Sequence, residues 1–214
     1  MVRVVCLANS VRPGGYCFAG IDLDTGEWVR PVSTRADMAI TRSMMSTGGE
    51  IPRLLDIVDI PLAGPSPDDG CQPENRLFSP GTWRRIGRLT PGDVLAYCED
   101  DAIILHNDRD RVPPGYFQTI PRDEWKSLQL IRNTRVQFEP DHLNPRKWRA
   151  SFEDGSGRPL ALKVTDPLAD SIARKYEDTD GDCLLTISLG GPWQPRNESL
   201  PMMCYKLVAG VIEV

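Results

Sequence analysis

The sequence is poor in the residues that usually mark a metal site, a catalytic centre or a membrane anchor. Its 214 residues include only two histidines and five lysines, against 20 arginines, and no lysine precedes Lys126. No stretch approaches 18 apolar residues, and the apolar run at 4–8 is too short for the core of a signal peptide. We therefore expect no contact with a membrane.

Catalytic and metal-binding fingerprints are also missing. The sequence contains no HExxH, GxSxG, phosphate-loop or dinucleotide-binding motif, and its six cysteines form no CxxC pair. We expect no catalytic residue, no cofactor and no metal, so an enzyme is the least supported class. Several cysteines lie in apolar runs, which is typical of buried, reduced thiols in a cytoplasmic protein.

The residues that are abundant are glycine and proline, with 18 and 19 copies. They favour short strands joined by turns over long helices. Apolar runs and alternating patterns in the second half predict five strands and, after Asp166-Pro167, a helix that begins with an Asp cap and ends near Tyr176. The strands are expected at 128–139, 147–154, 159–166, 183–190 and 205–214. Three strands, a helix and two strands is the order of the OB-fold, a small five-stranded barrel.

The first half begins in a similar way but becomes less regular after residue 62. Strands are expected at 2–8, 16–23, 27–32 and 53–62, and Thr90-Pro91 predicts the start of a helix. We expect a mainly β fold of two consecutive OB-like five-stranded barrels with short helices. The first would span 1–120 with an elaborated tail and the second 121–214, with the boundary near 121–127.

Several segments together resemble the dual OB-fold domain family, a group of uncharacterised, mostly bacterial proteins. The similar segments lie at both ends and in the middle of the chain: CLANSVRPGGYCFAGID, EWVRPVS, LLDIVDIPL, QPEN, VTDP and SLG…CYKLVAGVIE. The resemblance implies two OB-like barrels. It also implies binding of nucleic acid or oligosaccharide, and more distantly a role in prokaryotic defence, but it identifies no catalytic residue.

Candidate binding residues in the first half combine polar, basic and aromatic side chains. Asn9 and Arg12 flank a Gly-Gly turn whose backbone N–H groups could hold an anion, although the same pattern suits a plain hairpin turn. Trp28 and Arg30 share one strand face and could stack a base and bind its phosphate, with Tyr16 adding surface. The alternative is a partly buried tryptophan beside a surface arginine.

Two further groups follow in the first half. Glu74, beside Gln72 and Asn75, could orient a small ligand or simply form a turn. Arg84 and Arg85 belong to the strongest basic cluster, since residues 76–88 hold four arginines and no acidic residue. Arginine binds phosphate with two parallel hydrogen bonds, but a solvated loop would also explain the cluster.

The second half contains the other candidates. Arg146, Trp148 and Arg149 begin the second expected strand, and Trp193 and Arg196 lie in the loop before the last one. An OB-fold binds ligands on its strand 2–3 face and with these loops, so the two stretches could meet on one surface. Trp148 could equally belong to the core.

Three functions remain open. The first is a non-enzymatic protein that binds single-stranded nucleic acid or nucleotides, with aromatic residues stacking bases and arginines holding phosphates. The formal net charge of −5 argues against a polybasic binder. The second is a sensor of a small ligand or modified nucleotide, built from Asn9, Arg12, Trp28, Arg30 and Glu74. The third is a subunit whose proline-rich loops dock a partner protein.

Overall fold

The computed structural model describes all residues except 13, 46, 67–70, 80 and 196–199. The chain forms two compact units, the first from Met1–Pro67 with Glu74–Tyr97 and the second from Asp68–Pro73 with Cys98–Val214. Segment 98–120 belongs to the second unit because, for example, the Glu99 N–H donates to the Leu130 carbonyl over 2.8 Å. The domain boundary that the sequence suggests between residues 120 and 121 stays a prediction.

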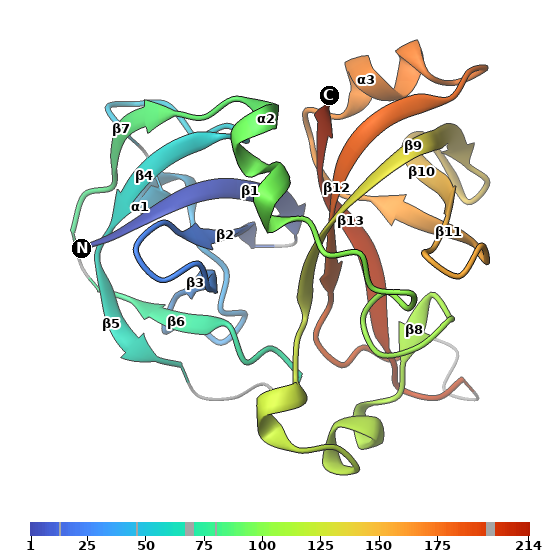
Figure 1. The fold of residues 1–214 in the computed structure, drawn as a ribbon. Helices are drawn as coiled ribbons and strands as arrows, with labels where there is room; N and C mark the ends of the chain where they lie inside the picture. The colour runs from blue at the N-terminus through green and yellow to red at the C-terminus, as the bar shows by residue number, and fades with distance from the viewer. Residues whose placement is uncertain (13, 46, 67–70, 80, 196–199) are drawn as a thin grey trace. The chain divides into compact units, whose positions relative to one another are not determined.

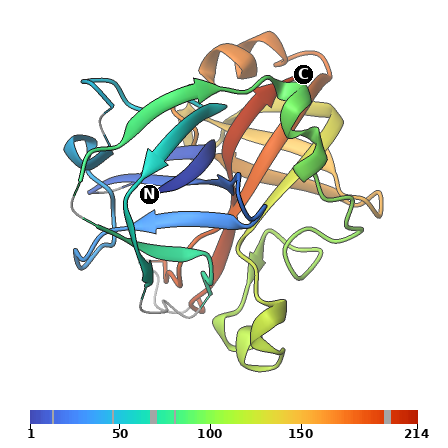
Figure 2. The same cartoon turned by 60° about the vertical axis from the view of Figure 1, so that its left-hand side comes forward.

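The first unit contains one sheet of seven strands in the order β5-β6-β3-β2-β1-β4-β7 (Figures 1 and 2). The strands are β1 (Val2–Arg12), β2 (Gly15–Asp22), β3 (Trp28–Val32), β4 (Asp56–Ile60), β5 (Leu62–Pro65), β6 (Asn75–Phe78) and β7 (Arg84–Arg88). All pairs are antiparallel except β3 with β6, which run parallel. Five strands were expected here, and β5, β6 and β7 arise from segments whose pattern was irregular.

Close packing of β1 against β2 depends on one glycine. A Cβ atom added at Gly20 would lie 1.9 Å from the carbonyl oxygen of Val5, so no larger residue fits at this point of the ladder. The short helices of the first unit are α1 (Arg42–Met45), α2 (Pro91–Val94) and the 3-10 turn η1 (Leu95–Tyr97). α2 begins where Thr90-Pro91 predicted, with a capping box in which Thr90 and Asp93 exchange side-chain-to-backbone hydrogen bonds.

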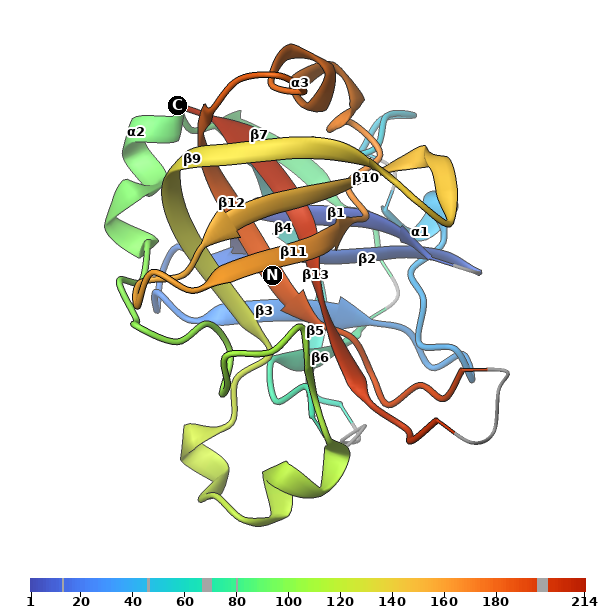
Figure 3. The same cartoon turned by 90° about the vertical axis from the view of Figure 1, so that its right-hand side faces the viewer.

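The second unit contains a sheet in the order β11-β10-β9-β12-β13-β8, and a parallel pairing of β11 with β13 closes it into a ring (Figure 3). The strands are β8 (Arg111–Val112), β9 (Leu128–Asp141), β10 (Asn144–Glu153), β11 (Pro159–Val164), β12 (Gly181–Leu189) and β13 (Cys204–Glu213). Helix α3 (Asp170–Lys175) lies between β11 and β12, and the 3-10 turns η2 (Pro114–Gln118) and η3 (Arg122–Glu124) precede β9. This confirms the predicted mainly β class and its OB-fold order of three strands, a helix and two strands.

One local prediction in the second unit is wrong. Asp166 was expected to cap a helix starting at Pro167, but α3 begins at Asp170 after the cap residue Ala169, which makes no side-chain cap. Asp166 instead accepts hydrogen bonds from the backbone N–H of Leu168 (2.8 Å) and of Val211 on β13 (3.1 Å). The tertiary contact to β13 therefore uses the carboxylate that the local pattern assigned to the helix.

The core of the second unit follows the two-residue period of its strands. On β10, Ala150 and Phe152 are buried, whereas Arg149, Ser151 and Glu153 face outward. All six cysteines of the chain are described, and all are free thiols. Among the helices that the structure describes, none is long and apolar enough to cross a membrane.

Candidate ligand-binding face of the second unit

The candidate site lies on the outward side of β9, β10 and β11, which we call the outer face (Figure 3). Register places its side chains in rows across the strands. One row holds Glu139, Arg149 and Lys163, and the next holds Gln137, Ser151 and Ala161. Residues between these rows, such as Phe138, Ala150 and Leu162, point into the core. Packing of the inward residues in the barrel core thus fixes the positions of the polar side chains on the outer face.

One end of the outer face opens into a cavity of about 440 Å³, the loop-end cavity. It joins the β9–β10 loop, strands β10 and β11, the start of the β12–β13 loop and strand β13. Its lining residues are Asp110, Leu143, Arg149, Ala161, Leu162, Lys163, Gly190, Gly191, Trp193, Tyr205, Lys206 and Leu207. The structure therefore brings together Arg149 and Trp193, which were predicted from two distant stretches.

An exposed tryptophan forms one wall of the loop-end cavity. Trp193 is 56% exposed, and its backbone is held by a two-way bridge to Met203 with N···O distances of 2.9 and 3.0 Å. Its ring meets that of Tyr205 edge to face at 5.7 Å between centroids. The Arg111 guanidinium lies 5.8 Å from the centre of the Tyr205 ring. A backbone bridge and a supporting aromatic ring position this tryptophan for stacking.

The cations of the cavity are anchored by a buried carboxylate. Asp141 is 2% exposed and lies 3.4 Å from an Arg149 nitrogen and 3.9 Å from the Lys163 ammonium. Burial alone would raise the pKa of Asp141. However, hydrogen bonds from the Leu143 and Asn144 N–H groups and the neighbouring cations hold this pKa below its usual value. Asp141 thus stays ionised and fixes where the two positive charges lie.

Lys206 also lines the cavity, but its ammonium group is already hydrogen-bonded to protein oxygens. Its Nζ donates to the carbonyls of Ile104 and Asn107, each at 2.6 Å, and to Asn107 Oδ1 at 3.1 Å. Burial lowers the pKa of Lys206 to about 8. These contacts bind β13 to the segment before β8, so we assign Lys206 a structural role.

The neighbours Trp148 and Arg149 lie on opposite sides of β10. Trp148 packs against the core, and its Nε1 donates to Asp170 Oδ1 on α3 at 2.9 Å. The Arg174 guanidinium lies 5.7 Å from the centre of its ring. Of the other predicted residues of the second unit, Arg146 is exposed near the same end of β10, and Arg196 lies outside the described residues.

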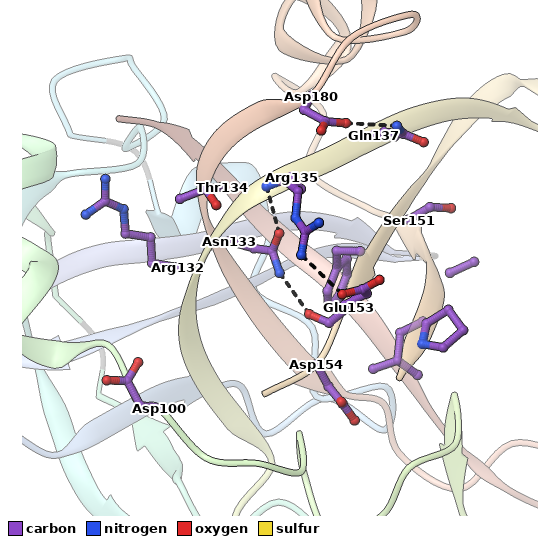
Figure 4. Close-up of a pocket in the computed structure, with 14 residues that line it drawn as sticks. Asp100, Arg132, Asn133, Thr134, Arg135, Gln137, Ser151, Glu153, Asp154 and Asp180 are labelled. Carbon is purple, nitrogen blue, oxygen red and sulfur yellow. Dashed lines mark hydrogen bonds and ion pairs between the residues drawn. The ribbon is translucent and has the colours of Figure 1, made fainter. Parts of the chain in front are cut away.

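The opposite end of the outer face opens into a larger cavity of about 800 Å³, the strand-end cavity (Figure 4). Ion pairs and hydrogen bonds link its polar side chains: Arg135 to Glu153 at 3.3 Å, Gln137 to Asp180 at 2.8 Å, and Asn133 to the Glu153 carbonyl at 2.8 Å. The charged residues in its lining are Asp100, Arg132, Arg135, Glu153, Asp154 and Asp180. No predicted site residue lies here, and the two cavities share Ala161.

The predicted residues of the first unit are spread over several places. Asn9 is buried and donates to the Pro52 carbonyl over 2.7 Å, whereas Arg12 is exposed and reaches Cys17 Sγ at 3.6 Å. Tyr16 is half-buried and forms an isolated bridge with Ile40. Trp28 is also half-buried, and the strand period puts it on the same side of β3 as Arg30.

Buried polar groups gather where β3 pairs with β6. Arg30 and Glu74 are both buried, and the Arg30 N–H donates to the Glu74 carbonyl over 2.9 Å. Arg30 stands opposite Asn75 in the ladder. Within the described part of the chain, neither polar atom of the buried Asn75 side chain has a hydrogen-bond partner. A buried amide without hydrogen-bond partners lowers the stability of the fold unless a ligand or water supplies them.

Three arginines of the basic cluster in the first unit form ion pairs across the sheet. Arg84 lies 2.7 Å from Asp59, and both Arg85 (3.9 Å) and Arg88 (2.8 Å) approach Asp56. These aspartates belong to β4, the neighbour of β7, and are buried. A cavity of about 520 Å³ borders Arg84 and Arg85. The charges that looked free in the sequence are paired in the fold.

Sequence reasoning missed Lys163, Tyr205 and Leu143 at the loop-end cavity, and Arg111, which contacts Tyr205. Lys163 had a detectable signal, because the alternation of the hairpin 147–166 puts it on the outward side together with Arg149. Arg111 and Tyr205 had none, since β8 joins β13 across more than 90 residues. Among the described residues, no group of three or more His, Cys, Asp or Glu is placed to hold a metal ion.

Comparison with known proteins supports the architecture. Residues 2–211 match the family described as Dual OB-containing domain, which is nearly the whole chain. No curated protein and no solved structure matches it. The match therefore bears on the fold and carries no specific activity.

Proposed function

This chain belongs to the dual OB-containing domain family, and on that premise we propose that it is a non-enzymatic protein that binds single-stranded nucleic acid or nucleotides. The observation that carries the proposal is the loop-end cavity, where an exposed tryptophan lies with two anchored cations. In this role Trp193 stacks on a base, and Arg149 and Lys163 hold the adjoining phosphate. OB-folds commonly bind ligands with this face and these loops.

The proposal is tested by fluorescence anisotropy with a labelled single-stranded oligonucleotide at low salt. Trp193→Ala should cost about 1–3 kcal/mol of binding free energy, the usual value of one base stacked on an aromatic ring. Lys163→Gln should reduce the slope of log K against log salt by about 0.7, the value for one phosphate contact on a single strand. Arg42→Gln, an exposed change of the same charge in the first unit, is the control.

Absence of binding to DNA and RNA at low salt, with the protein shown to be folded, would refute the proposal. Equal losses for Lys163→Gln and Arg42→Gln would also count against it, because they would indicate a diffuse effect of net charge. A cytoplasmic location stays part of the proposal, supported by six free thiols in a chain with no disulfide.

A second candidate is a sensor of a small ligand or modified nucleotide in the first unit. The observation in its favour is the buried Asn75 amide, which has no hydrogen-bond partner among the described residues and lies beside the buried Arg30 and Glu74. A thermal-shift screen with mono-, di- and cyclic nucleotides tests it, with Asn75→Leu as the variant that should abolish any shift. A flat result across the screen would exclude these ligands. A protein partner on the proline-rich loops stays a prediction.

A further inference from the structure

The charged residues of β10 are distributed unevenly along the strand. β10 reads NPRKWRASFE, with Arg146, Lys147 and Arg149 towards the loop-end cavity and Glu153 at the other end. Arg146 and Lys147 are exposed, and so is Glu153. On β11, Lys163 stands opposite Arg149 and the uncharged Pro159 stands opposite Glu153. On β9, the exposed Glu139 stands opposite Arg149, so this end of the outer face holds one acidic residue among its cations.

The two cavities show the same contrast. The loop-end cavity is lined by three basic residues and one acidic residue, and the strand-end cavity by two basic and four acidic residues. Of the three loop-end cations, Lys206 is bound to carbonyl groups, and Arg149 and Lys163 share the buried Asp141. Both arginines of the strand-end cavity are already paired, Arg132 with Asp182 at 2.7 Å and Arg135 with Glu153 at 3.3 Å. Asp180 accepts a 2.8 Å hydrogen bond from the Gln137 amide (Figure 4). A phosphate would therefore be repelled at this end.

Spacing along the strand limits the length of ligand between these ends. The row of Arg149 and the row of Glu153 are four residues apart on β10, or about 13 Å at the rise of a strand. About two nucleotides fit before the chain meets the acidic end, whereas an OB-fold usually covers about 4–16.

We infer that the outer face binds a short nucleotide ligand of about two units, either free or as the end of a strand, and not an internal stretch of a long strand. The inference rests on the proposed function and specifies its ligand. The base nearest the loops stacks on Trp193, its phosphate meets Arg149 and Lys163, and the ligand ends near Ser151. The strand-end cavity acts as an electrostatic stop.

The first test is the dependence of affinity on length, measured by calorimetry with unlabelled oligothymidylates of 2, 4, 8 and 12 residues. Affinity should rise by less than about threefold beyond the dinucleotide, because phosphates added towards the strand-end cavity meet its carboxylates. A steady rise to the 12-mer would overturn the inference while leaving the proposed function intact. Failure of every length to bind folded protein would refute the proposed function itself, and the inference with it.

A competition between linear and circular single-stranded 20-mers separates the two sources of ligand. Competition by the linear 20-mer but not by the circular 20-mer identifies a strand end as the ligand. Competition by the dinucleotide but by neither 20-mer identifies a free nucleotide. Equal competition by the circle and the linear strand would overturn the inference, because a circle has no end.

A charge variant tests the electrostatic stop directly. Glu153→Gln with Asp180→Asn should tighten binding of the 12-mer about fivefold, the effect of removing roughly 1 kcal/mol of repulsion, and leave the dinucleotide unchanged. Glu177→Gln with Asp178→Asn, two exposed changes outside the cavity lining that remove the same two charges, is the matched control. Equal effects on both lengths, or none, would contradict the stop. If the double variant does not fold, Glu153→Gln alone serves, since Glu153 is exposed.

Discussion

Both units pair arginines with buried aspartates, but they place these pairs in different surroundings. In the first unit, three arginines of β7 pair with two buried aspartates of β4. In the second unit, one buried aspartate positions two cations beside an exposed tryptophan, at the mouth of a cavity. The first arrangement joins two strands, and the second positions cations beside an exposed aromatic side chain. A basic cluster therefore indicates a binding site only when the location of its counter-charges is known.

Removal of Asp56 should have the largest effect on this comparison. Asp56 is 1% exposed and accepts a 2.8 Å hydrogen bond from Arg88 and another from the Arg53 N–H. Asp56→Ala should lower the free energy of unfolding by about 3 kcal/mol, because it removes a buried carboxylate together with its hydrogen bonds to the Arg53 N–H and to Arg88 and its ion pair with Arg85. Urea denaturation measures this, and a loss below about 1 kcal/mol would show that the cluster is not structural.

A second prediction separates the neighbours Trp148 and Arg149. Trp148→Ala should cost about 2 kcal/mol of stability, since a half-buried core contact and the bond to Asp170 are lost. Arg149→Gln should instead weaken oligonucleotide binding. Thermal unfolding and binding are measured on both variants. Loss of binding by a folded Trp148→Ala protein, with no change in stability, would assign Trp148 to the ligand after all.

The third prediction concerns pH and the buried Lys206. Its pKa is lowered to about 8, below the ordinary 10.5, so between these values the unfolded chain binds more protons than the folded one. Stability from this group therefore rises with pH from about 8 to about 10.5, by at most about 1.4 kcal/mol per unit. Urea denaturation across this window should show a shallower rise for Lys206→Met than for the wild type. Parallel curves would contradict the assignment.

The smallest effect is expected for an exposed arginine of the first unit. The Arg84 side chain is 67% exposed, so its pair with Asp59 is weakened by solvent. Arg84→Gln should change stability by less than about 1 kcal/mol and leave oligonucleotide affinity unchanged. A clear loss of affinity would move the binding site to the first unit and reverse the comparison.

Local patterns predicted the second unit better than the first. Strands β9 to β13 were expected within a few residues, because alternation and turn residues lie within each hairpin. β5, β6 and β7 were missed because the segments that form them show little alternation of apolar and polar residues. The role of Asp166 was mispredicted because its partner on β13 lies 45 residues away.

The candidate site was predictable only in part. Arg149 and Trp193 follow from the expected OB-fold order, which brings the second strand and the last loop together. Arg84 and Arg85 looked like better candidates than Lys163, because the sequence shows a run of arginines but not the aspartates 25 to 32 residues earlier that neutralise it.

The sequence by itself determined the mainly β class, the succession of strands and helix along the second unit, and the side of β10 on which each residue lies. These follow from short-range physics, since a strand alternates its side chains and Pro or Gly ends it. The tertiary structure alone decided which charges are paired and which loops converge on the exposed tryptophan. Those features depend on contacts between residues far apart in the chain, whose energies no local pattern reports.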